Sequence, residues 1–209
     1  MGAQKQLPSL LNLEVADNLA PNGLQLSRAT QALAYKMIIH WKSLVARTST
    51  ECQLDRIKDE LEDYAGLRPT SGRIWLSLRD KAFSRAARDF YWKTIHDAYY
   101  LGSFWVNSNS HPERAMCVEC DETETMEDIL TDCISSGQET IWKLTQDLLT
   151  RADMVLPEVT YSSILGCNLF QFLDSEGKTD KAARCCFTIL MAEAAHLIWK
   201  IHCDWKIKR

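Results

Sequence analysis

Three cysteines stand at a spacing that suits a zinc ion: Cys117, Cys120 and Cys133, within the stretch CVECDETETMEDILTDC. Zinc is held tetrahedrally by cysteine sulfur and histidine nitrogen, and a C-x2-C turn places two thiolates on one side of the ion with little backbone strain. The residues after Cys120 predict a short helix. Thr125 can cap this helix, Asp128 lies in its first turns, and Cys133 lies near its end. The stretch therefore predicts a zinc knuckle with three thiolates and one ligand still to be assigned.

Two residues could supply the fourth ligand. Asp128 could bind through an oxygen, and His111, six residues before Cys117, could fold back onto the site. Histidine suits a structural thiolate site better than a carboxylate does, so His111 is favoured over Asp128. The alternative interpretation is a degenerate knuckle, in which the three cysteines are ordinary thiols and no metal is bound.

An enzymatic zinc site would keep one position open for water. The segment HPE at residues 111–113, followed by CVEC, is similar to the H-x-E…P-C-x-x-C signature of zinc deaminases. Only three residues separate its two halves here, however, and no proline precedes Cys117. Phosphate-binding G-x-x-x-x-G-K-[ST] and nucleophile-elbow G-x-S-x-G motifs are absent. The sequence predicts no enzyme, no catalytic residue and no small-molecule substrate.

The elements that position these residues are predicted to be helices throughout. The chain has 46% hydrophobic and 25% charged residues but only 8 Gly and 5 Pro, and almost no alternating apolar and polar residues. Residues 1–23 carry Pro8, Pro21 and Gly23 without a sustained period, which predicts an extended lead-in or linker. Residues 24–209 predict a single all-α domain with the zinc-knuckle-like segment 111–134 as an insert.

Within this domain, apolar residues recur at three- and four-residue steps. The predicted helices span residues 24–46, residues 52–66 with caps at Thr48–Thr50 and a stop at Gly66, residues 73–102 with a break near Lys81, residues 138–153, and a long final helix from about Thr179. In the final helix, Cys186, Leu190, Leu197 and Ile201 recur at the spacing of core residues. His196 and His202 are interpreted as solvated or capping histidines.

Charge is unevenly distributed. Between residues 68 and 97, seven basic side chains face three acidic ones, whereas residues 113–139 carry nine acidic side chains and one arginine. The basic side chains predicted to bind RNA or DNA are Arg73, Arg79, Lys81, Arg85, Arg88 and Lys93. An ordinary solvated helix face is the alternative, and the net charge of −4 favours that alternative.

The start of the chain lacks the basic, apolar and small-residue regions of a secretory signal. The most apolar window, residues 185–201, contains Glu193, His196 and Lys200 and falls short of the roughly 20 apolar residues of a membrane span. It predicts a buried helix. The sequence therefore predicts an intracellular protein of the cytoplasm or nucleus, without a membrane partner.

Several motifs in order carry a family resemblance: LSRATQALAY, IWLSLRDKAFSRAARDFYWKTIHDAYYLGSFW, CVECDETETMEDILTDC, SSILGC and LIWKIHCDWKIKR. From Leu24 to the end, the chain resembles the region after the RNase H domain in polyproteins of basidiomycete non-LTR retrotransposons. The cysteine stretch is similar to their reverse-transcriptase zinc-binding region. That family has Glu-His-Ile-Leu where this chain has Glu127-Asp128-Ile129-Leu130, so Asp128 replaces the family's histidine.

The resemblance implies a zinc-binding, retrotransposon-derived module without reverse transcriptase or RNase H activity. Two functions follow as hypotheses. The first is a non-enzymatic relic of a retroelement polyprotein that binds RNA or DNA through its basic helix and is braced by the zinc knuckle. The second is a protein-interaction or accessory protein, or an orphan gene product of unknown role, in which the knuckle binds no metal.

Overall fold

The computed structural model describes residues 30–41, 47–66, 68–108, 111–133, 137–155 and 157–208. The chain divides into two compact units, Met1–Ala46 and Arg47–Arg209. The lead-in predicted for residues 1–23 lies outside the described residues. Because the boundary follows Ala46, the helix predicted from Leu24 belongs to the first unit, whereas the sequence predicts one domain from Leu24 onward.

The described residues are helical and contain no β-strand, which confirms the all-α prediction. Extended backbone pairs only at two isolated bridges in this part of the chain, Met116 with Thr123 and Leu173 with Thr179. The elements are α1 (Gln31–Trp41), α2 (Thr48–Ala65), α3 (Ser71–Ser77), α4 (Arg85–Ile95), α5 (Ser103–Val106), η3 (Pro112–Ala115), η4 (Asp128–Asp132), α6 (Gln138–Arg151), α7 (Tyr161–Leu165), η6 (Cys167–Leu169) and α8 (Lys181–Lys208).

Helix α1 is the described helix of the first unit. The Thr30 hydroxyl accepts a hydrogen bond from the Leu33 N–H at 3.3 Å, as expected of a residue at a helix start. The helix predicted for residues 24–46 is confirmed over Gln31–Trp41, and residues 24–29 and 42–46 lie outside the described residues. Its apolar side chains are not all buried within the unit, since Tyr35 and Ile38 are exposed.

Helix α2 opens the second unit and ends where the sequence predicts. Gly66 adopts the left-handed conformation with φ of 65°, and its N–H donates to the Glu62 carbonyl at 2.7 Å. The start of α2 differs from the prediction of a cap at Thr48–Thr50. Arg47 is the N-cap, and its side chain makes no capping hydrogen bond. Thr50 lies inside the helix, where its hydroxyl contacts His96 Nδ1 at 3.1 Å.

The break predicted near Lys81 separates α3 from α4. Both helices start with a side-chain cap, since Thr70 accepts from the Arg73 N–H and Ser84 accepts from the Ala87 N–H. The turn between the helices is held by Arg88, whose Nε donates to the Leu78 carbonyl at 2.8 Å. Arg88 thus holds the backbone of the turn through its side chain.

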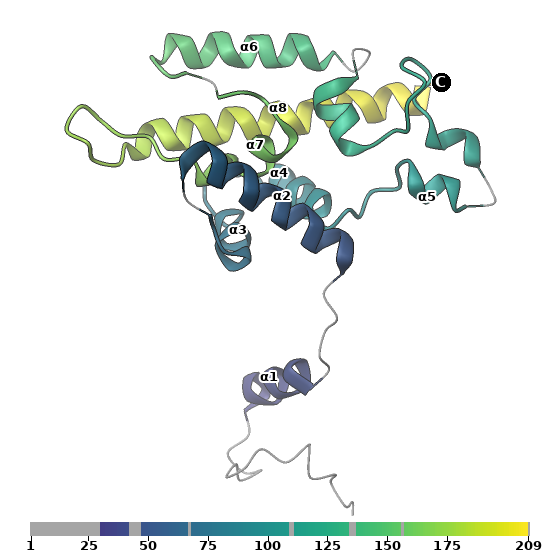
Figure 1. Cartoon of the computed structure of the whole chain (residues 1–209), viewed down its shortest axis with the longest axis horizontal. Coiled ribbons are helices and arrows are strands. Elements are labelled where there is room, and N and C mark those ends of the chain that lie inside the picture. The colour runs from purple at the N-terminus through teal and green to yellow at the C-terminus, as the bar shows by residue number, and fades with distance from the viewer. Residues whose placement is uncertain are drawn as a thin grey trace, which may run out of the picture. The chain divides into compact units, whose positions relative to one another are not determined.

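Helix α8 is the long yellow helix of Figure 1, and α6 lies alongside it. Its buried face carries Phe187, Met191, Ala195 and Ile198. The predicted core residues Cys186, Leu190, Leu197 and Ile201 each lie one position earlier than a buried residue, and Leu197 and Ile201 are 45% and 41% exposed. Cys186 and Leu190 are partly buried and pack against the core, so the prediction holds for this half of the face. Leu197 and Ile201 are each one residue, about 100° of helix rotation, away from the buried Ile198 and His202.

By length and composition alone, α8 is also the one helix among the described residues that could cross a membrane. Its inner face is nevertheless part of the protein core. It packs against α4, α6, α7, η4 and η6. Buried side chains of the core that meet there include Phe90, Leu130, Trp142 and Ile164. This packing agrees with a core helix, as the sequence predicts.

Candidate metal centre

The first two cysteines lie in a tight hairpin. The Cys117 N–H donates to the Glu122 carbonyl at 2.8 Å, and the Asp121 N–H donates to the Cys117 carbonyl at 3.0 Å. Asp121 adopts a positive φ of 56°, a conformation that aspartate tolerates better than most residues. The hairpin reverses the chain within a few residues and holds both cysteines at one end.

The remaining candidate ligands come from η4, which is a π-helical turn. Thr125 caps it as predicted, with its hydroxyl accepting from the Asp128 N–H at 3.0 Å. The Cys133 N–H donates to the Asp128 carbonyl at 2.7 Å, five residues back. In an α-helix these two side chains would point about 140° apart. The wider turn rotates less per residue and brings them to the same side, as π-turns at functional sites often do.

Side chains of α6 hold the widened turn in place. Trp142 Nε1 donates to the Leu130 carbonyl at 2.8 Å, and Gln138 Nε2 donates to the Thr131 carbonyl at 2.8 Å. Both side chains are buried. Leu130 and Thr131 lie in the last turn before the helical stretch ends, where carbonyl groups lack an intrahelical partner, and these donors satisfy them.

Together the hairpin and η4 form one cluster of four ligands. One ligand atom from each of Cys117, Cys120, Asp128 and Cys133 lies within 4.8 Å of all the others. The Sγ atoms of Cys117 and Cys133 are 3.6 Å apart, as are Cys120 Sγ and Asp128 Oδ1. Ligand sulfurs around tetrahedral zinc lie about 3.8 Å apart, from a Zn–S distance of about 2.3 Å. The cluster could therefore hold a metal ion.

Asp128 is the least satisfied member of the cluster. Its side chain is only 8% exposed, and its Oδ2 atom has no hydrogen-bond partner among the described residues. Oδ1 accepts a weak hydrogen bond from the Cys120 thiol. Burial, reinforced by the nearby charges of Asp132 and Glu124, raises the pKa of Asp128 above its ordinary value. A buried oxygen with no donor is chemically suited to a cation.

The thiols of the hairpin differ in acidity. Burial raises the pKa of Cys117, but the N–H groups of Glu119 and Cys120 and the neighbouring thiols lower it below its ordinary value. A backbone hydrogen bond from Glu122 lowers the pKa of Cys120, but burial, Cys117 and the Asp128 charge raise it to about 12. A metal that binds here would have to displace the thiol protons of the hairpin.

His111 does not join the cluster, which reverses the preference for it as the fourth ligand. Its Nδ1 lies 3.0 Å from Glu113 Oε1, and its side chain is half exposed. Its ring lies against Trp105, with the ring centres 6.3 Å apart. The 3-10 turn that begins at Pro112 leads from His111 toward the hairpin, while Asp128 occupies the fourth position.

The structure adds three residues that sequence reasoning missed. Glu124 follows the hairpin, is 2% exposed, and has His202 Nε2 at 2.5 Å and Lys206 Nζ at 2.6 Å. We refer to Glu124, His202 and Lys206 as the carboxylate latch. The latch joins the knuckle to the last turns of α8, which lie beside it in Figure 1. His202 is therefore buried and ion-paired rather than solvated, and no local spacing links residues so far apart in the chain.

The knuckle also meets the start of α5 at Gly102. A Cβ atom at Gly102 would lie 2.6 Å from the Glu124 carbonyl oxygen, and the residue has a positive φ of 34°. Only glycine allows the two backbones to approach this closely. Glu124 is thus enclosed on two sides. The start of α5 lies against its backbone carbonyl group, and His202 and Lys206 contact its side chain.

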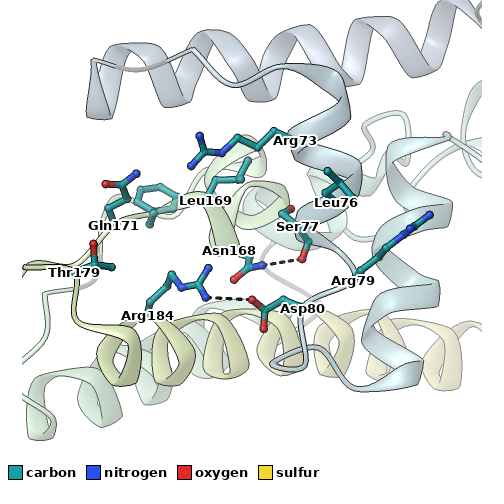
Figure 2. Close-up of a pocket in the computed structure, with 11 residues that line it drawn as sticks. Arg73, Leu76, Ser77, Arg79, Asp80, Asn168, Leu169, Gln171, Thr179 and Arg184 are labelled. Carbon is teal, nitrogen blue, oxygen red and sulfur yellow. Dashed lines mark hydrogen bonds and ion pairs between the residues drawn. The ribbon is translucent and has the colours of Figure 1, made fainter.

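The cations predicted to bind nucleic acid do not form one free surface. Arg88 is used to hold the α3–α4 turn, and Lys93 Nζ pairs with Asp89 at 2.8 Å. The exposed members of the set are Arg73, Arg79, Lys81 and Arg85. Arg73 and Arg79 line an open pocket that also includes Arg184, shown in Figure 2. The structure thus leaves four of the six cations exposed.

Comparison of the chain with protein-family models, curated proteins and solved structures found no match.

Proposed function

We propose that the chain is a non-enzymatic helical module in which the knuckle binds one zinc ion as a structural brace. The observation that carries the proposal is the cluster of four candidate ligands, in which a buried Asp128 oxygen has no hydrogen-bond partner among the described residues. Thiolates favour zinc over magnesium or calcium. Four protein ligands close the coordination shell, which is typical of structural rather than catalytic zinc.

The metal content of the purified protein tests this proposal. We expect about one zinc per chain in the wild type and Asp128→His, and little in Cys120→Ser. Cys185→Ser is the matched control, because Cys185 is an exposed cysteine of α8 outside the cluster. His111→Ala should retain its zinc, since His111 lies outside the cluster.

Cobalt substitution adds a check on coordination. Cobalt in the site should give the intense visible absorption of a tetrahedral thiolate complex, and Cys120→Ser should lose it. A wild type without zinc beside an Asp128→His variant with one zinc would support the degenerate knuckle instead. In that case the second hypothesis, an accessory protein without metal, is the better one.

Nucleic-acid binding is the second candidate function, and the exposure of Arg73, Arg79, Lys81 and Arg85 favours it. An origin from a retroelement polyprotein and an intracellular location remain predictions from the sequence. Salt-dependent binding to single-stranded and duplex RNA and DNA tests it. The double variant Lys81→Gln and Arg85→Gln should weaken binding and reduce the slope of log affinity against log salt by about 1.5 to 2.

Lys143→Gln with Lys181→Gln is the control for this second candidate, because both are lysines of other helices. No retention of the wild type on any of these nucleic acids at low salt would refute nucleic-acid binding. The zinc proposal would be unaffected.

A further inference from the structure

A pocket of about 560 Å³ lies between α3, the turn that follows it, η6 and the start of α8. Its lining includes three arginines and one aspartate: Arg73, Arg79, Arg184 and Asp80. Figure 2 shows Arg73 extending toward Gln171 and Arg184 extending toward Asp80, whereas Arg79 extends to the opposite side of the pocket. The pocket therefore offers two guanidinium groups and two neutral polar side chains to one ligand.

Asp80 orients one of these guanidinium groups. Its Oδ2 lies 3.2 Å from Arg184, and its Oδ1 accepts from the Ala82 N–H at 3.0 Å. The Arg73 guanidinium has no ion pair or hydrogen bond among the described residues. One arginine is therefore held in position and the other is free to close on an anion. The lining keeps a net positive charge after the pair between Asp80 and Arg184 is counted.

The floor of the pocket is rigid. Asn168 is buried, its Nδ2 donates to the Ser77 carbonyl at 2.7 Å, and its Oδ1 accepts from the Thr188 hydroxyl at 3.2 Å. This amide connects α3, η6 and α8 at one point. A site assembled from three elements and fixed by a buried amide is preorganised, which lowers the entropic cost of binding.

A second pocket of about 240 Å³ adjoins the first and is mainly apolar. The two share Arg73, Leu169, Phe170 and Gln171, and the second adds Leu61, Tyr64, Pro69 and Leu173. Tyr64 and Leu173 are 59% and 64% exposed. Tyr64 also packs edge-on against Phe170, with ring centres 5.2 Å apart. Arg73 thus stands between a cationic compartment and an apolar one.

We propose that these two pockets bind a small organic anion, a phosphate monoester or carboxylate that carries an apolar or aromatic group. The anionic group lies against Arg73 and Arg184, and the apolar group lies against Tyr64 and Leu173. Charge favours a small ligand over a polyanion, because α2 carries the exposed acidic residues Glu62 and Asp63 next to Tyr64. This site does not depend on a metal in the knuckle.

Phenyl phosphate is the probe, with inorganic phosphate and phenol as its two halves. We expect saturable binding of phenyl phosphate by calorimetry, tighter than binding of either half. Arg73→Gln should weaken it at least about tenfold, because a charge-assisted hydrogen bond is lost. Tyr64→Ala should weaken phenyl phosphate but leave inorganic phosphate unchanged. Arg73 has no partner to lose, so its variant should keep the wild-type circular dichroism.

The double variant Lys81→Gln and Arg85→Gln is the control, because neither residue lines the two pockets. The absence of saturable phenyl phosphate binding at about 10 mM would overturn the proposal. Equal binding by wild type and Arg73→Gln would overturn the location. Much tighter binding of an oligonucleotide or phosphopeptide, lost in Arg73→Gln, would overturn the small ligand in favour of that macromolecule.

Discussion

At the scale of single residues, Asp128 has opposite effects on the metal-free fold and on a bound metal. Its buried Oδ2 atom has no donor among the described residues, so the carboxylate carries a desolvation cost without compensation. A cation would supply that compensation. The Asp128 carboxylate thus lowers the stability of the metal-free protein, and the same carboxylate would raise the affinity of the site for a cation.

We expect Asp128→Asn to raise the free energy of unfolding of the metal-free protein by about 1 kcal/mol, because the amide is cheaper to bury than the carboxylate. The same change should lower zinc affinity at least about tenfold through the loss of an anionic ligand. Urea unfolding in chelator and competitive zinc titration measure the two effects. Asp132→Asn is the control, an exposed acid in the same turn. A decrease in both quantities would contradict the expectation.

The three cysteines of the candidate site could be predicted from sequence: a C-x2-C turn brings Cys117 and Cys120 together through local geometry, and the short helix after Cys120 ends near Cys133. The fourth ligand could not be predicted. Choosing between His111 and Asp128 requires knowing that η4 is a π-turn, which rotates Asp128 toward Cys133. The spacing of the cysteines likewise does not indicate that His111 contacts Glu113.

At the scale of elements, the carboxylate latch attaches the knuckle to α8. Glu124 is buried, and its two partners, His202 and Lys206, come from the last turns of one helix. Breaking a buried pair by removing one partner commonly costs several kcal/mol, because the remaining charges stay desolvated. The side chain of Lys206 is 30% exposed, which limits this cost for the lysine.

We therefore expect Glu124→Gln to lower the free energy of unfolding by about 3 kcal/mol. Burial raises the pKa of Glu124, but His202 and Lys206 lower it below the ordinary value of 4.5. A lowered acid pKa stabilises the fold above the unfolded value, and this stability is lost as pH falls below about 4.5. Urea unfolding at pH values from about 7 to about 3 measures this loss of stability.

The exposed Glu122 of the same hairpin provides the control variant, Glu122→Gln, which should be close to neutral. Glu124→Gln should also show a flatter dependence of stability on acid pH than the wild type. An unchanged acid dependence in Glu124→Gln would assign the acid sensitivity to other carboxylates.

Helix positions were predictable to different degrees. The stop of α2 at Gly66 and the break between α3 and α4 follow from residues that act locally. The buried face of α8 does not, because apolar residues surround the helix. Phe187 and Cys186 are both compatible with a core, and only contacts with other helices decide between them.

At the scale of the whole molecule, the second unit has one large core, and the cluster that could hold a metal ion lies at its edge. The four candidate ligands are not members of the core cluster, although Met126, Ile129 and Leu130 of the same segment are. Composition predicts the all-α class correctly, because Gly and Pro, which interrupt helices, are rare in the chain. The division after Ala46 was not predictable, since the apolar period of residues 24–46 resembles that of the later helices.

Removal of metal should therefore loosen one end of the molecule rather than unfold it. We expect a chelator to increase amide hydrogen exchange in residues 115–133 and in the last turns of α8. Amides of Ile57 in α2 and Ile95 in α4 should keep their protection, because both side chains are fully buried far from the ligands in sequence. A uniform increase over the chain, or no change anywhere, would contradict this division.

The carboxylate latch also sets an order of assembly during synthesis. The four candidate ligands lie between Cys117 and Cys133, so a nascent chain holds the complete set soon after these residues leave the ribosome. Glu124 must wait for His202 and Lys206, which are translated much later. Trp142 and Gln138 of α6, which hold the π-turn, follow next, so the knuckle can be complete while the Glu124 carboxylate is still hydrated, and it docks onto α8 only once that helix is made.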